Sequence, residues 1–128
     1  MIRNKVFRDI LRLTGFRESF KNAGKGMVYL FLYHRNMRII FMMGIIALLL
    51  GFNFNLKGIE LIALCITVTL VFMAEIFNTA VELMMNTITE KYHVKIKLIK
   101  DIAAGIVLIT CLNAAVIGYV LFIRKLFK

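Results

Sequence analysis

Three long apolar runs, separated by short polar segments, constrain the fold of this chain most strongly. One covers Ile39–Phe52, one begins near Leu61, and the last, Ile102–Ile123, has 22 residues without a charged side chain. A helix needs about 20 apolar residues to cross the ~30 Å hydrocarbon core of a bilayer. The chain is also 61% hydrophobic, with a mean hydropathy of +0.84 and no proline. We therefore expect an all-α integral membrane protein with three transmembrane helices.

The flanking residues set the bounds of the spans, which we place at about 37–56, 59–89 and 102–123. The first run is short, and apolar residues on either side of it extend it to a sufficient length. The second helix is on the order of 45 Å long, longer than the hydrocarbon core, so its C-terminal part should project beyond the membrane. Residues 1–128 are expected to form a single membrane-embedded domain.

The N-terminal segment has a different, basic and amphipathic pattern. Five apolar residues recur there at helical spacing: Val6, Ile10, Leu13, Phe16 and Phe20. The basic residues of the segment lie mostly off that stripe. Such a pattern is typical of a helix that lies on the membrane surface, and we place it at about 3–33. Packing of this helix on a partner protein is the alternative interpretation.

The charge distribution favours lipid over nucleic acid as a partner. The net charge is +10, with 17 basic against 7 acidic residues, but the basic residues flank the apolar runs, where anionic headgroups and phosphates are the expected partners. Thirteen of the basic residues fall on one side of the membrane if the N-terminus is cytoplasmic, which predicts that orientation. Cys65 and Cys111 lie within apolar runs without a metal-binding spacing, and we expect them to be core thiols.

Polar residues at the end of the second run are the candidate functional residues. Glu75, Asn78, Glu82 and Asn86 are spaced by three, four and four positions, so a helix carries them on one narrow stripe. A carboxylate in hydrocarbon is costly, roughly 2.5–3.5 kcal/mol at a helix centre, and such residues are functional candidates by default. Three interpretations remain open: a structural ion pair, for instance with Lys100, a proton-coupling carboxylate of a small transporter, and an enzyme site.

The residues that share the cytoplasmic side suit phosphoryl transfer. This reaction needs cations on the phosphates, Mg²⁺ held by oxygen ligands, and a carboxylate that accepts the proton of the attacking hydroxyl. The basic segment from Thr89 to Lys100, followed by Asp101, could supply the cations. The sequence has no Walker A loop, kinase glycine-rich loop or Rossmann fingerprint, which excludes the soluble nucleotide-binding folds by motif.

A family resemblance favours the enzyme. The motif Glu-x-x-Asn-Thr-Ala-Val-Glu at residues 75–82, followed by Tyr92-His93 and by Lys-Asp-Ile-Ala-Ala-Gly at 100–105, resembles the prokaryotic diacylglycerol kinase family, which includes undecaprenol kinases. The resemblance extends from about Ser19 to the third span. It implies a bacterial plasma-membrane homotrimer with active sites shared between subunits at the cytoplasmic surface. The implied activity is transfer of the ATP γ-phosphate to the hydroxyl of undecaprenol or diacylglycerol.

The same resemblance implies roles for individual residues. Glu75 matches the catalytic base, Asn78 the asparagine that supports it, and Glu82 a metal-binding glutamate. Four further residues lie where nucleotide contacts are expected: Tyr92, His93, Lys100 and Asp101. The implied cofactors are ATP as phosphoryl donor and Mg²⁺, with Mn²⁺ as an alternative metal.

Two positions depart from the family pattern. Where the family usually has Glu-Arg-Asn before the first span, with the glutamate as a metal ligand, this chain has His34-Arg35-Asn36. Imidazole is a poor Mg²⁺ ligand compared with a carboxylate. Asn86 stands where an aspartate is common. The alternatives for the chain are therefore a lipid kinase with fewer metal ligands and a catalytically weak or inactive member that acts as a binding or structural module in the membrane. His34 as a generic interfacial residue is the simplest account of that position.

Overall fold

The computed structural model describes residues 2–11, 13–88 and 93–127, and within these ranges the chain is helical with short connections. The elements are α1 (Ile2–Leu11), α2 (Leu13–Tyr33), α3 (Arg35–Asn53), α4 (Ile59–Ile88), α5 (Val94–Gly118), the π-helical segment η1 (Tyr119–Ile123) and α6 (Arg124–Leu126). They divide into two compact units, residues 1–35 and 36–128. The expectation of an all-α fold is confirmed for the described residues.

The first unit consists of α1 and α2. In α2 the rings of Phe16 and Phe20 lie 6.2 Å apart, and both side chains are exposed. The side chains of Val6, Ile10 and Leu13 lie outside the described residues. The surface location expected for this segment therefore stays a prediction.

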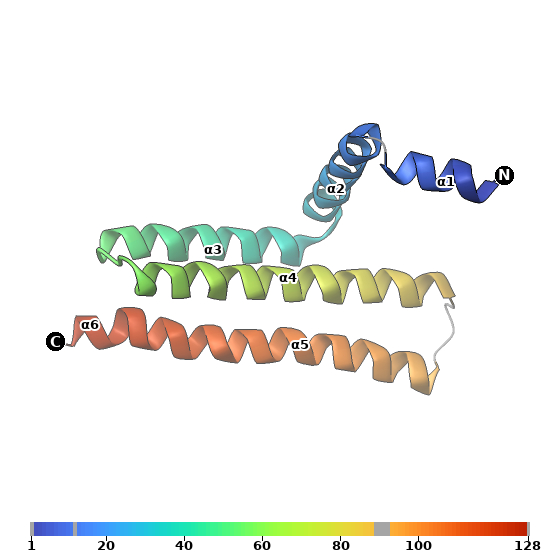
Figure 1. The fold of residues 1–128 in the computed structure, drawn as a ribbon. Coiled ribbons are helices and arrows are strands. Elements are labelled where there is room, and N and C mark those ends of the chain that lie inside the picture. Colours follow the sequence, from blue (N-terminus) through green and yellow to red (C-terminus); the bar gives the residue numbers. More distant parts are fainter. Residues whose placement is uncertain (1, 12, 89–92, 128) are drawn as a thin grey trace. The chain divides into compact units, whose positions relative to one another are not determined.

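The second unit is a bundle in which α3, α4 and α5 run antiparallel to one another in succession (Figure 1). Three stretches are long and apolar enough to cross a membrane, Arg35–Asn53, Ile59–Ile88 and Val94–Leu126, with mean hydropathies of 1.7, 2.2 and 2.5. The prediction of three span-length helices is thus confirmed. Helix α5 begins eight residues before the expected third span, because residues 94–101 are also helical.

The connection between α3 and α4 is a Schellman motif. Asn55 adopts a left-handed φ of 56°, and the N–H of Leu56 donates a 3.0 Å hydrogen bond to the carbonyl of Gly51. This geometry ends a helix by satisfying a terminal carbonyl, and it places an apolar residue back against the last turn. Leu56 accordingly is only 2% exposed. Gly58, with a φ of 62°, precedes α4 and accepts from the N–H of Ile62.

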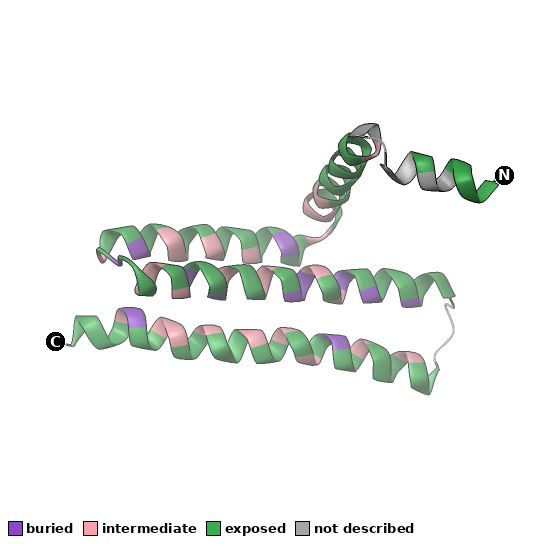
Figure 2. Ribbon diagram, viewed as in Figure 1, coloured by how far each residue is buried: buried purple, intermediate pink, exposed green. Residues whose placement is uncertain are grey.

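The bundle has two small apolar clusters at opposite ends of α4. Leu56, Leu64 and Leu121 form one of them, near the start of α4. Val81, Met85 and Ala103 form the other, near its end. Six further described residues of this unit are buried: Met37, Gly51, Thr67, Ala74, Glu75 and Thr79. Figure 2 shows most of the length of the three helices as exposed, and many of the exposed residues are apolar. An apolar exterior of this kind suits a bilayer, where lipid chains replace water as the surrounding medium.

The two cysteines correct one expectation. Both are free, and both are exposed in this subunit rather than being core thiols. An apolar run in a membrane helix has lipid-facing as well as bundle-facing positions, and hydropathy alone does not separate them.

Candidate active site

The polar residues of the motif lie on the last turns of α4 and become more exposed along the helix. Glu75 is 6% exposed and Thr79 is 3% exposed. Asn78 is half-buried, whereas Glu82 and Asn86 are exposed. Because a helix rises 1.5 Å per residue, Glu82 lies about 10 Å beyond Glu75 along the axis. A buried carboxylate is therefore followed by an exposed one on the same face.

The side-chain oxygen of Asn78 is an unsatisfied acceptor. Its Oδ1 is buried and has no hydrogen-bond partner among the described residues. A buried acceptor without a donor costs about 1–3 kcal/mol, so such groups are rare unless a ligand or water supplies the donor. The site around Asn78 is chemically suited to a molecule that brings an O–H or N–H group.

A cross-helix hydrogen bond joins α4 and α5 at the exposed end of this site. The Nζ of Lys100 donates to Oδ1 of Asn86 over 2.8 Å. Beneath this contact the cluster of Val81, Met85 and Ala103 packs the two helices together. One of the three open interpretations expected an ion pair between a motif glutamate and Lys100, whereas the contact observed is with Asn86. Within the described part of the chain, Lys100 bonds to a neutral amide, and Glu82 has no hydrogen bond or ion pair.

The first turns of α5 hold two more of the predicted residues in local contacts. His93 caps the helix, where its Nδ1 accepts a 3.2 Å hydrogen bond from the backbone N–H of Lys95. Asp101 pairs with Lys97 one turn earlier, over 2.6 Å. Both members of that pair are more than half exposed, and an exposed pair of this type contributes only about 0–1 kcal/mol.

Two predicted residues lie outside the described part of the second unit. Tyr92 lies outside the described residues. His34 belongs to the first unit, where its ring lies 6.0 Å from that of Tyr29. The expected roles of both residues stay predictions.

The donor set for a divalent cation is sparse. Among the described residues, no three His, Cys, Asp or Glu side chains come together as a metal-binding group. Mg²⁺ in nucleotide enzymes is commonly held by one or two carboxylates, together with substrate phosphates and waters. The exposed carboxylate of Glu82 fits that mode, but only when a phosphate supplies further oxygens.

Sequence reasoning did not find a cavity of about 400 Å³ between α3, α4 and α5. It lies where small residues of α3 and α5 face α4, among them Gly44, Ala47, Ala114 and Gly118. Their spacing of three or four positions within each helix is the one signal in the sequence that could have indicated it.

These features define a small helical membrane protein with a buried carboxylate where its central span becomes polar. Residues 21–122 match the prokaryotic diacylglycerol kinase family, and the chain belongs to that family. It is 34% identical over 109 residues to a diacylglycerol kinase of Synechocystis sp., an alignment that covers 84% of this chain and 62% of that protein. It is 32% identical over 114 residues to the undecaprenol kinase of Bacillus subtilis, covering 89% of this chain and 93% of that protein. The chain thus spans less than two thirds of the length of the first relative and nearly all of the second.

Proposed function

We propose that this protein transfers the γ-phosphoryl group of ATP to the hydroxyl of a membrane lipid, at the cytoplasmic surface of the bacterial plasma membrane. The observation that carries the proposal is the buried carboxylate of Glu75, which precedes the exposed Glu82 on the same face of α4. A lipid hydroxyl and a soluble nucleotide meet at such a boundary. Membership of the prokaryotic diacylglycerol kinase family supports the same reaction.

In this proposal Glu75 is the general base. It accepts the proton of the lipid hydroxyl as that oxygen attacks the γ-phosphorus and the bond between this phosphorus and the β,γ-bridging oxygen breaks, releasing ADP. Asn78 would orient the hydroxyl by donating an amide N–H to its oxygen, because the single hydrogen of that hydroxyl is directed to Glu75. Burial keeps water, which would compete as the phosphoryl acceptor, away from the base.

The nucleotide would lie at the exposed end of the site. Lys100, held by Asn86, offers its positive charge to the phosphates. We include Tyr92, His93 and Asp101 in the nucleotide contacts, as the family resemblance implies. Glu82 would hold Mg²⁺ or Mn²⁺, and His34 would be a weaker second ligand. The bound metal supplies charge neutralisation on the phosphates.

The substrate is undecaprenol or diacylglycerol, the lipids that the names of the two relatives indicate. The Asn-Thr-Ala form of the motif and the Arg35-Asn36 segment resemble the undecaprenol kinases more than the diacylglycerol kinases, which favours undecaprenol. We further propose that the chain forms a single catalytic domain, assembles as a homotrimer, keeps its N-terminus in the cytoplasm and lays α1 and α2 on the membrane surface.

A second candidate function rests on position 34. A family member that has lost a carboxylate metal ligand there would bind nucleotide and lipid without turnover, as a binding or structural module. Transfer of labelled γ-phosphate by the purified protein in lipid vesicles separates the two functions. Undecaprenol and diacylglycerol are offered separately, each with Mg²⁺ and with Mn²⁺. Product on either lipid establishes the kinase, whereas nucleotide binding without product in any condition favours the module.

A further inference from the structure

The cavity between α3, α4 and α5 lies on the same face of α4 as Glu75 and Asn78, further into the membrane-spanning part of the bundle. On α4 it is lined by Leu64, Val68 and Val71, and Glu75 follows one turn later. Steps of four, three and four positions keep these residues on one side of a helix. On this face of α4 the cavity lining therefore ends at Val71, and Glu75 and Asn78 are the next residues along the helix.

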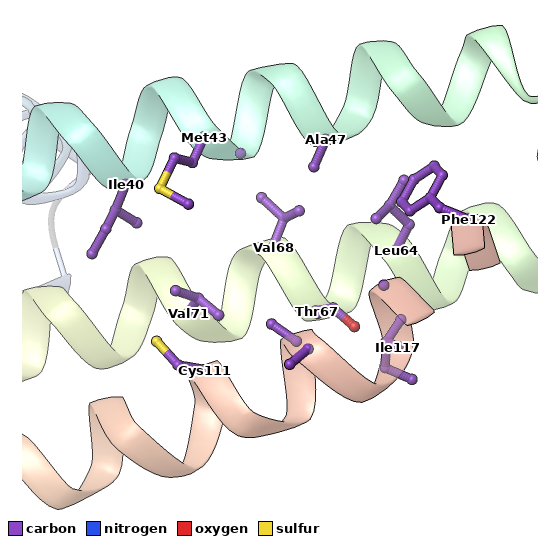
Figure 3. Close-up of a pocket in the computed structure, with 14 residues that line it drawn as sticks. Ile40, Met43, Ala47, Leu64, Thr67, Val68, Val71, Cys111, Ile117 and Phe122 are labelled. Atoms are coloured by element: carbon purple, nitrogen blue, oxygen red, sulfur yellow. The ribbon is translucent and has the colours of Figure 1, made fainter. Parts of the chain in front are cut away.

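Small side chains on the facing helices create the space. Gly44 and Ala47 line it from α3, and Ala114 and Gly118 line it from α5. In Figure 3, Val68 points from α4 toward α3, and the thiol of Cys111 points from α5 toward α4. On α5 and the following segment η1, the lining residues extend from Cys111 to Phe122, which corresponds to about 16 Å along the helix axis.

The chemistry of the lining suits a hydrocarbon. Thr67 carries the one hydroxyl among the described lining residues, and that hydroxyl already donates a 2.7 Å hydrogen bond to the carbonyl of Ala63. A cavity with so few free polar groups does not hold water and takes apolar guests. Its volume of about 400 Å³ lies within the range of roughly 300–1,000 Å³ that is typical of ligand sites.

We propose that this cavity binds the hydrocarbon tail of a lipid alcohol whose hydroxyl lies at Glu75 and Asn78. This inference rests on the proposed function and assigns the place of the substrate tail within one subunit. Two observations point to a lipid alcohol rather than to a bare hydrocarbon. The cavity is in register with Glu75 on α4, and Asn78 on the same face has a buried amide whose Oδ1 has no partner among the described residues, so polar groups that a hydroxyl can contact follow the apolar lining.

The two native cysteines provide a test that does not depend on turnover. Cys111 lines the cavity and Cys65 does not, and both are free and exposed. The purified full chain in detergent micelles is treated with a membrane-permeant maleimide, and labelling of each cysteine is followed by peptide mass spectrometry. The lipids added are dioleoylglycerol, undecaprenol, or none. Either long-chain alcohol should slow labelling of Cys111 several-fold and leave that of Cys65 unchanged.

Two outcomes would overturn the proposal. Equal labelling of Cys111 with and without lipid means that the tail lies elsewhere. Protection of Cys111 that is already complete without lipid, while Cys65 reacts, means that a second copy of the chain or another part of the protein fills the cavity. Protection by lipid in a protein that transfers no phosphate supports the tail site and refutes the kinase, so the two proposals fail separately.

A variant pair extends the test to kinetics. At Gly118 a Cβ atom would meet nothing within 4 Å, so Gly118→Leu fills the cavity without a backbone clash. Val116→Phe adds bulk two residues away, at a side chain that is 61% exposed and outside the cavity. Gly118→Leu should raise KM for dioleoylglycerol about tenfold and leave KM for short-chain dibutyrylglycerol unchanged, whereas Val116→Phe should change neither. Equal effects of Gly118→Leu on both alcohols would contradict a tail site.

Discussion

The ammonium of Lys100 on α5 donates a 2.8 Å hydrogen bond to Oδ1 of Asn86 on α4. The partner is a neutral amide, so the contact fixes the position of the lysine without neutralising its charge. The nearby Lys97 is different, because it is paired with the carboxylate of Asp101. Lys100 is therefore oriented by the bundle and keeps its full charge for an anionic ligand.

Removing this acceptor should weaken nucleotide binding more than it affects chemistry. Asn86→Ala leaves Lys100 unoriented, and a hydrogen bond of this type is worth about 0.5–1.5 kcal/mol, which corresponds to a roughly 2- to 10-fold rise in KM for ATP. We expect kcat to change little. Asn86→Gln keeps a neutral amide acceptor and should stay closer to the parent protein in KM, whereas Asn86→Asp would pair its charge with Lys100 and should also raise KM. An unchanged KM in Asn86→Ala would show that Lys100 needs no such support.

Replacing the proposed base should abolish turnover and leave the fold intact. Glu75→Gln keeps the size of the side chain but cannot accept the hydroxyl proton, and loss of a general base typically costs about 10²–10⁴ in rate. The measurement is γ-phosphate transfer, combined with light scattering to follow assembly.

A matched control for Glu75→Gln lies at the other end of the same helix. Glu60 pairs with Lys125 of α6, and both are partly exposed. Glu60→Gln should keep full turnover and lose at most about 1 kcal/mol of stability. If Glu75→Gln is as active as Glu60→Gln, another group accepts the proton.

The helices could be predicted from the sequence because their main determinant is local. The apolar runs fix the three span-length helices, and Gly58 marks the start of α4. Which side of each helix faces the bundle is decided by contacts between helices. For that reason Cys65 and Cys111 were expected in the core but are exposed, and the cavity along α5 was not foreseen.

In the candidate site, too, some features follow from the local sequence and others depend on contacts between helices. The stripe of polar residues on α4 follows from helical spacing alone. The partner of Lys100 does not, because the relative register of α4 and α5 depends on how Val81 and Met85 pack against Ala103. Sequence reasoning offered a carboxylate as that partner, whereas the structure has Asn86.

Restoring a carboxylate at position 34 tests whether that position is a metal-ligand site. If it is, His34→Glu should raise kcat or lower the Mg²⁺ concentration that gives half-maximal activity, because Mg²⁺ prefers carboxylate oxygen over imidazole nitrogen. His34→Gln, which adds no charge, serves as the control. Mg²⁺ titrations that coincide for all three proteins would assign His34 to the membrane interface instead.

The contact of Gly51 in α3 with Leu64 in α4 makes a prediction about stability. A Cβ atom at Gly51 would lie 2.6 Å from Cδ2 of Leu64 and 3.5 Å from Cδ1 of Leu56, and both leucines are buried. Gly51→Ala should therefore lower the free energy of unfolding by about 1–3 kcal/mol, the usual cost of overpacking. Gly24 in α2 has nothing within 4 Å of its Cβ position, and Gly24→Ala should be neutral or stabilising by up to about 1 kcal/mol. Unfolding in mixed micelles at increasing dodecyl sulfate measures both, and equal stability of the two variants would mean that α3 and α4 can separate at Gly51 without cost.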